Sequence, residues 1–148
     1  MEPARSVIVL LVEDNADHAE LTLRALKDDA RLDEIFWVKD GEEALDFLFH
    51  RGRYASLPHV SRPSLILLDI DLPKINGHAV LDQVKTHLDL RAIPVVILTT
   101  SSRDDDVARA YQAGANSYVA KPAPFTDFMQ RVRALKRYWT LISLLPHP

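Results

Sequence analysis

The chain has 148 residues, about the length of one domain, and its 47 % of hydrophobic residues is enough for a buried core. The absence of cysteine excludes disulfides, thiol catalysis and thiolate metal sites, and the net charge of −3 argues against a nucleic-acid surface. The apolar run at 7–12 is too short to span a bilayer, and no small-residue cleavage site accompanies it, so we expect a cytoplasmic protein that does not bind membranes.

Five short apolar runs mark the predicted strands. The first covers 7–12, and the second, at 35–38, is rich in aromatic and β-branched residues. The others lie at 65–68, 95–98 and 117–120. Because continuous apolar runs of this length are typical of strands buried on both faces, they predict a parallel sheet covered by helices.

The segments between these runs have apolar residues at helical spacing. These residues are Leu21, Leu23 and Leu26; Ala44, Leu45 and Leu48; Val80, Leu81 and Val84; and Val107, Ala108 and Tyr111. Gly114 follows the last set as a helix C-cap. Strand and helix therefore alternate five times, which predicts a doubly wound α/β domain with a five-stranded parallel sheet. We expect one domain over 1–148, with its core at about 6–137 and a C-terminal helical extension at about 138–148.

A loop is predicted at 51–62, where Gly52, Pro58 and Ser61 break any regular structure. It contains three arginines and His59. Two interpretations stay open for this loop, namely a solvated surface loop and a contact with a partner.

The last predicted helix is unusually long, from about Phe125 to Leu145, or roughly 30 Å. Its apolar residues form a heptad-like stripe, which consists of Phe128, Val132, Leu135, Trp139 and Ile142. Because exposed apolar patches usually mark an interface, we expect a homodimer through this helix. The alternative is a helix that bends back onto its own domain.

Residues with reactive or charged side chains lie where four of the predicted strands end. Glu13 and Asp14 follow the first strand, Asp69 the third, Thr99 the fourth and Lys121 the fifth. The carboxyl ends of parallel strands share one edge of the sheet, and ligands bind at that edge. We therefore expect these side chains to meet although they are far apart in the sequence.

The chemistry of such a cluster follows from its charges. Carboxylates this close repel one another unless a cation lies among them, and carboxylate oxygens with water and a backbone carbonyl are a typical Mg²⁺ environment. One carboxylate can then attack phosphorus and form an acyl phosphate. A lysine and a hydroxyl can hold the other phosphoryl oxygens, which is most of what phosphoryl transfer requires.

Each residue also has a simpler interpretation when it is considered alone. Asp14 with Asn15 is a possible N-cap of the first helix. Asp69 is compatible with a turn, Thr99 is a common strand residue, and Lys121 is compatible with a surface charge. The prediction of a site depends on the joint placement of these residues at one edge of the sheet.

The sequence resembles the receiver domains of bacterial two-component systems. The matching pieces span most of the chain, and they are Val12-Glu13-Asp14-Asn15, Leu67-Leu68-Asp69-Ile70-Asp71-Leu72-Pro73, Gly77, Ile97-Leu98-Thr99-Thr100, Gly114-Ala115 and Lys121-Pro122. The resemblance implies a flavodoxin-like sheet with strand order 2-1-3-4-5. In that order the first and third strands are neighbours.

The resemblance also implies roles for the site residues. Asp69 is the implied phosphoacceptor, and Mg²⁺ is implied to bind to Glu13, Asp14, Asp69 and the backbone carbonyl of Asp71. Lys121 is implied to pair with the phosphoryl group. The domain is then a signalling switch and not an enzyme, and the only reactions implied for it are its own phosphorylation and autodephosphorylation.

Two further implications concern the switch and the backbone. Thr99 is implied to move toward the phosphoryl group, and Tyr118 is implied to turn inward when it does. The helix at 104–112 and the fifth strand are then expected to shift, which changes a surface for partner binding or dimerisation. The Lys121-Pro122 peptide is implied to be cis.

Less specific sequence features indicate a subgroup of receiver domains. The segments Leu98-Thr99-Thr100-Ser101 and Ala115-Asn116-Ser117-Tyr118, and the pair Tyr138-Trp139, are similar to those of single-domain regulators paired with bacterial phytochrome kinases. The implied phosphoryl donor is therefore a histidine kinase of the phytochrome type.

Three other functions are each compatible with part of the sequence. A haloacid-dehalogenase-like phosphatase would share the pair Asp69 and Asp71, but its aspartate pair normally follows the first strand. A docking module that is never phosphorylated would not need the complete acceptor set. A DNA-binding regulator would need an output domain, and the basic residues Arg131, Arg133, Lys136 and Arg137 are more simply a solvated helix face.

Overall fold

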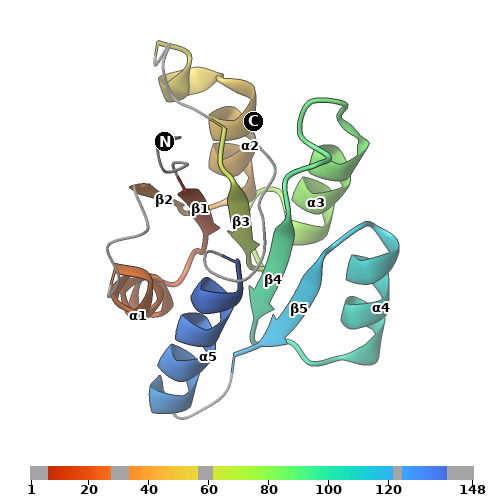
Figure 1. Cartoon of the computed structure of the whole chain (residues 1–148). Coiled ribbons are helices and arrows are strands. Elements are labelled where there is room, and N and C mark those ends of the chain that lie inside the picture. The colour runs from red at the N-terminus through yellow and green to blue at the C-terminus, as the bar shows by residue number, and fades with distance from the viewer. Residues whose placement is uncertain (1–6, 28–33, 57–61, 122–124, 140–148) are drawn as a thin grey trace, which may run out of the picture.

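The computed structural model describes residues 7–27, 34–56, 62–121 and 125–139. Within them, five strands form one parallel sheet with helices on both faces (Figure 1). The elements in chain order are β1 (Ile8–Val12), α1 (Ala16–Lys27), β2 (Glu34–Val38), α2 (Gly41–Phe49), the short 3₁₀ helix η1 (Gly52–Tyr54), β3 (Leu65–Leu68), α3 (Gly77–Thr86), β4 (Val95–Thr99), α4 (Asp104–Gln112), β5 (Ser117–Ala120) and α5 (Phe125–Arg137).

The strands lie in the order β2-β1-β3-β4-β5, and every neighbouring pair is parallel. The predicted doubly wound sheet and the order implied by the resemblance are therefore confirmed. The order changes direction between β1 and β3, whose carboxyl ends lie side by side because Val12 pairs with Leu68. Ligands bind at such a switch point in open α/β sheets.

Alternate residues of the inner strands face two separate cores. In β1, Leu10 and Val12 pack on one face, whereas Val9 and Leu11 pack on the other. The first face is covered by α2, α3 and α4 and the second by α1 and α5 (Figure 1). Burial on both faces explains why these strands appear in the sequence as unbroken apolar runs.

Side-chain caps fix where three helices begin, and hence how the loops at the sheet edge run. The Asn15 side chain accepts a hydrogen bond from the His18 backbone N–H (3.0 Å), and Asp40 and Asn76 cap α2 and α3 in the same way. Of the pair Asp14 and Asn15, which was a possible N-cap, Asn15 caps α1 and Asp14 does not. Asp14 is exposed at the sheet edge.

Helix α4 packs differently from the expectation. Of its residues only Ala110 is buried, whereas Ala108 and Tyr111 are exposed. The spacing of Val107, Ala108 and Tyr111 therefore predicted the helix but not its buried face. The C-cap of α4 is Ala113, so the predicted cap Gly114 lies one residue farther on, with a φ of 105° in the region that favours glycine.

The predicted loop at 51–62 contains the 3₁₀ helix η1. Tyr54 of this helix is buried against Phe47 at a ring distance of 5.1 Å, and its hydroxyl donates to Glu43 (2.9 Å). The other residues at 51–56 are exposed, as expected for a solvated surface loop, whereas Tyr54 belongs to the core. Residues 57–61, and with them Pro58 and His59, lie outside the described residues.

Part of the predicted dimer interface on α5 is buried within the domain itself. Phe128 and Val132 are 1 % and 0 % exposed, in the core that α5 forms with α1. The assignment of these two residues to a dimer interface is wrong, because their side chains are enclosed by the domain itself. Leu135 and Trp139 are partly buried against the same core. Ile142, and the predicted helix beyond Trp139, lie outside the described residues.

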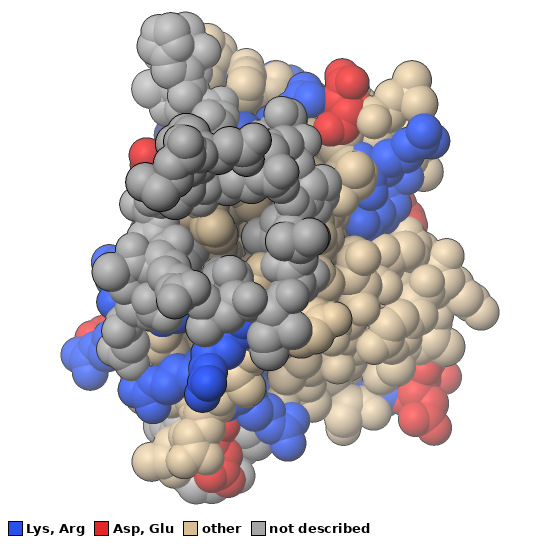
Figure 2. Space-filling view, in the orientation of Figure 1, with Lys and Arg blue, Asp and Glu red and all other residues tan. Residues whose placement is uncertain are grey.

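The basic residues of α5 differ in their exposure to solvent. Arg131, Arg133 and Arg137 are exposed, whereas Lys136 is buried. In Figure 2, Lys and Arg side chains gather at the lower left, where α5 lies. None of the helices in the described part of the chain combines the length and apolarity that a bilayer crossing requires.

Candidate functional site

The carboxyl ends of β1, β3, β4 and β5 bring the predicted site residues to one edge of the sheet. Backbone hydrogen bonds continue the sheet one residue past the strands, from Asp69 N to Val12 O (3.1 Å) and from Glu13 N to Val38 O (3.0 Å). On the other side, Lys121 N donates to Thr99 O. The side chains at these positions are therefore held by sheet backbone, although they are up to 108 residues apart.

Three carboxylates form a tight cluster at this edge. One oxygen each of Glu13, Asp14 and Asp69 lies within 4.8 Å of the others. Glu13 and Asp69 are buried, at 2 % and 6 % exposed, whereas Asp14 opens to solvent. Buried like charges at this separation repel each other strongly, so the cluster requires a cation.

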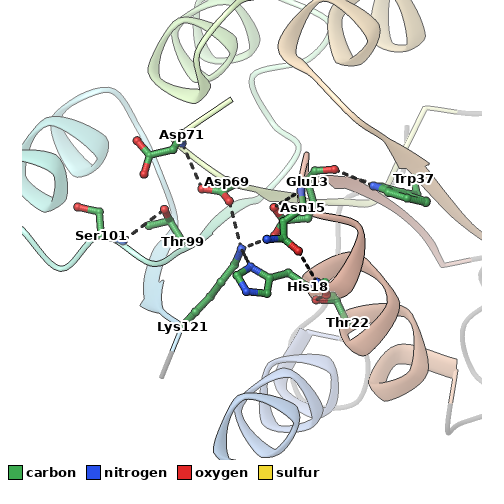
Figure 3. Close-up of polar contacts among 10 residues, drawn as sticks. All are labelled: Glu13, Asn15, His18, Thr22, Trp37, Asp69, Asp71, Thr99, Ser101 and Lys121. Carbon is green, nitrogen blue, oxygen red and sulfur yellow. Dashed lines mark hydrogen bonds and ion pairs between the residues drawn. The ribbon is translucent and has the colours of Figure 1, made fainter. Parts of the chain in front are cut away.

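Lys121 supplies positive charge to the two buried carboxylates. Its ammonium forms an ion pair with Glu13 and another with Asp69 Oδ2 (3.1 Å), as Figure 3 shows. The lysine side chain is only 4 % exposed. The simpler interpretation of Lys121 as a surface charge is therefore wrong.

Burial raises the pKa of the Glu13 carboxyl to about 7. The ion pair with Lys121 lowers this pKa, and repulsion from Asp69 raises it, so burial and repulsion together exceed the effect of the lysine. One lysine thus leaves the cluster short of positive charge. A hard divalent cation prefers oxygen ligands, so the three carboxylates are a suitable donor set for one.

Backbone N–H groups orient two of the carboxylates, and an indole N–H binds the backbone of Glu13. Asp71 N donates to Asp69 Oδ1 (3.2 Å), and Asn15 N donates to Glu13 Oε2 (3.2 Å). The indole of Trp37 donates to the backbone carbonyl of Glu13 (2.8 Å) from β2. The Asp71 backbone is therefore next to Asp69, while its side chain is exposed.

Gly77, the first residue of α3, allows the helix to lie directly against the backbone of Asp69. Its N–H donates to Ile70 O (2.8 Å). A Cβ atom here would lie 2.2 Å from Asp69 O and 2.6 Å from Ile70 Cα, both of them backbone atoms. The close approach of α3 to the site thus needs a residue without a side chain.

We expect Gly77→Ala to lower the free energy of unfolding by about 3 kcal/mol, the upper part of the usual range for overpacking. An ordinary helical glycine would instead gain up to about 1 kcal/mol on change to alanine. Urea unfolding followed by circular dichroism measures the difference, with exposed Asp82→Ala on the same helix as a control. A more stable Gly77→Ala variant would contradict the close contact.

A second polar group lies beyond Thr99, on the other side of Asp69 from Glu13 (Figure 3). The buried Thr99 hydroxyl accepts a long hydrogen bond from Ser101 N (3.5 Å), and the Tyr118 hydroxyl donates to Ser101 O (3.0 Å). Ser101 Oγ donates to Asp106 of α4 (2.5 Å), which also contacts the buried His78 of α3 (3.3 Å). The loop after β4 is therefore linked to α3, α4 and β5.

Sequence reasoning missed two residues of this site. His18 lies 3.1 Å from Lys121 Nζ, and Trp37 binds the Glu13 carbonyl. The signal for His18 was its position three residues after the N-cap Asn15, which places it on the first turn of a helix that starts at the sheet edge. No sequence signal indicated that the Trp37 indole binds the Glu13 carbonyl.

Comparison with known proteins gives a consistent picture. The response regulator receiver domain family matches residues 9–133. A probable methanogenesis regulatory protein, FilR2 of Methanothrix harundinacea, is 46 % identical over all of this chain and 93 % of its own length.

Solved structures similar to this chain include those of two response regulators. The phosphorylated cyanobacterial phytochrome response regulator RcpA has a TM-score of 0.91 at 37 % identity, over 96 % of this chain and 99 % of its own. Response regulator Rcp1 of Synechocystis sp. is 38 % identical over 94 % of this chain and 92 % of its own. Its Mn²⁺-bound structure has a TM-score of 0.88, over 95 % and 99 % of the two chains.

Proposed function

Because this chain belongs to the response regulator receiver family and is related to phytochrome response regulators, we propose that it accepts a phosphoryl group from a histidine kinase on Asp69, in a Mg²⁺-dependent reaction. A receiver domain is a signalling and not a catalytic protein, so the proposed chemistry is limited to its own phosphorylation and autodephosphorylation. The observation that supports the proposal best is the meeting of Glu13, Asp14, Asp69 and Lys121 at one sheet edge.

In this mechanism Asp69 is the nucleophile. One of its carboxylate oxygens attacks phosphorus, and the bond from phosphorus to the leaving group of the donor breaks. Lys121 already contacts Asp69 Oδ2 and would pair with a phosphoryl oxygen that arrives there. The buried Thr99 hydroxyl would donate to another phosphoryl oxygen.

The metal would be held by oxygens of Glu13, Asp14 and Asp69, with the Asp71 backbone carbonyl as a further ligand. When bound, it neutralises the charge that the carboxylates and the phosphoryl oxygens bring together. The Rcp1 structure with bound Mn²⁺ supports a divalent site in this family, and Mg²⁺ is the ion that we propose for this chain.

The proposed switch uses the second polar group. Ser101 is hydrogen-bonded to Thr99, Tyr118 and Asp106. If Thr99 turns toward the phosphoryl group, its hydrogen bond with Ser101 N breaks, and the loop that carries Ser101 is released on that side. The loop would then move with α4 and β5 and change the surface that they form. Figure 2 shows a broad area without charged side chains over this part of the molecule, which is suited to a partner.

A phytochrome-type histidine kinase is the phosphoryl donor that we propose, because the phytochrome response regulator RcpA is similar over nearly the whole chain. We also retain the homodimer through the C-terminal helix as a proposal. Its basis is the partly buried Leu135 and Trp139 and the half-exposed Tyr138, which line a groove beside β5.

One receiver domain over the whole chain is the domain organisation that we propose, since the family match spans 9–133.

Metal dependence is the direct test of this proposal. We expect the protein to gain the mass of one phosphoryl group from acetyl phosphate with Mg²⁺ present, and to gain none with excess EDTA, because the three carboxylates then lack their cation. Intact mass spectrometry measures this. Adding excess Mg²⁺ back is the control, and equal phosphorylation in EDTA would contradict the proposed site.

Two of the three alternative functions would give other results in this experiment. A docking module would never gain the phosphoryl mass from any donor. A phosphatase would release phosphate from small phosphoesters through many turnovers, and membership of the receiver family argues against it.

A further inference from the structure

His18 lies inside the proposed phosphorylation site although it belongs to none of the strand ends. It is on the first turn of α1, and its Nδ1 atom is 3.1 Å from Lys121 Nζ (Figure 3). On its other side the imidazole packs near Phe128 of α5, at a ring distance of 6.2 Å. The ring is therefore placed between the site lysine and the core.

The chemistry of the two groups defines which one donates. An ammonium group has only donors, so Nδ1 of His18 must be the acceptor. The imidazole is then neutral and carries its proton on Nε2. Burial lowers the pKa of His18, and the Lys121 cation lowers it further, although Asp69, Asp17 and Asp14 act in the opposite direction. The neutral form is thus the one that the surroundings favour.

His18 differs from the other two acceptors of Lys121 in one respect. Glu13 and Asp69 are the carboxylates that the metal and the phosphoryl group would occupy, so their contacts with the lysine must change during the reaction. His18 is neutral and comes from α1, outside the donor set. Its contact can persist while the carboxylates change partners.

We propose that His18 is a positioning residue, whose Nδ1 holds the Lys121 ammonium beside Asp69 while phosphoryl transfer takes place. This inference depends on the proposed function. In the reaction with acetyl phosphate, an Asp69 oxygen forms a bond to phosphorus, the bond between phosphorus and the acetyl oxygen breaks, and acetate leaves with that electron pair. Lys121 donates hydrogen bonds throughout and transfers no proton.

The rate of phosphorylation tests the role of the Nδ1 acceptor. We expect His18→Leu, which fills a similar volume beside Phe128 without an acceptor, to slow the reaction on the order of tenfold, the usual effect of losing a hydrogen bond to a charged group. His18→Asn keeps an acceptor at the position of Nδ1 and should recover most of the rate.

A matched control is available in His87. This histidine is also partly buried, and its Nδ1 also accepts a hydrogen bond, from Asp89 N (3.1 Å), but it lies after α3. His87→Leu should be phosphorylated at the wild-type rate. Comparable slowing in His87→Leu and His18→Leu would show a general loss of stability and overturn the proposal.

The histidine tautomer gives a readout that is independent of phosphorylation. Long-range ¹H–¹⁵N spectra of the metal-free wild type should show His18 neutral at pH 8 with the proton on Nε2, and Lys121→Met should weaken that preference. A proton on Nδ1 in the wild type, or an unchanged His18→Leu rate, would overturn the proposal for His18. Failure of the wild type to be phosphorylated would instead overturn the proposed function.

Discussion

Asp69→Asn is expected to abolish phosphorylation by acetyl phosphate and Mg²⁺. The substitution replaces the only oxygen nucleophile that the proposed mechanism uses by an amide, which does not form an acyl phosphate. The shape of the side chain is kept, and the amide oxygen can still accept the hydrogen bond that Asp71 N donates to Asp69 Oδ1. Intact mass should therefore show a folded protein that gains no phosphoryl group.

Asp71→Asn is the matched control for this prediction. Its carboxylate is two residues from Asp69 on the same loop but exposed, and only its backbone is proposed to serve the metal. This variant should still gain one phosphoryl group. A phosphorylated Asp69→Asn protein would place the acceptor elsewhere, and an inert Asp71→Asn protein would show that its side chain is required.

Phe128→Ala is expected to lower the free energy of unfolding by about 3–5 kcal/mol, the usual cost of removing a buried aromatic side chain. Phe128 is among the largest fully buried side chains, and it packs between α1 and the sheet. This loss is a large part of the roughly 5–15 kcal/mol that stabilises a typical domain. Urea unfolding at two protein concentrations that differ by about a factor of ten measures it.

Concentration distinguishes a core residue from an interface residue. If Phe128 is enclosed by its own domain, the loss should be the same at both concentrations, since no association is involved. Gln130→Ala is the control on the same helix, because Gln130 is exposed and its loss should cost less than about 1 kcal/mol. A loss in Phe128→Ala that appears only at the higher concentration would restore Phe128 to an interface.

The candidate site could be predicted largely because it depends on strand ends. A parallel sheet brings the carboxyl ends of its strands to one edge whatever the details of packing, so Glu13, Asp69, Thr99 and Lys121 had to meet once the strands were assigned. The strands themselves were identifiable because both faces of the sheet are covered, which leaves unbroken apolar runs such as 65–68.

The helices were predictable in extent but less so in orientation. The spacing in α4 identified a helix, yet Ala110 and not Tyr111 is the buried residue. The stripe in α5 was likewise correct as an apolar face, but Phe128 and Val132 face the core of their own domain. Periodicity shows that a helix has an apolar face and contains no information on which surface covers it.

The sequence by itself therefore determined the five-stranded α/β architecture and the acidic edge that receives Lys121, since both follow from local patterns and from the geometry of parallel strands. Only the tertiary structure decided that His18 contacts Lys121, that Gly77 lies against the Asp69 backbone, and that Phe128 is buried. These contacts depend on the position of each helix on the sheet to within about an ångström. Close packing among many side chains sets that position, and no short segment of the sequence encodes it.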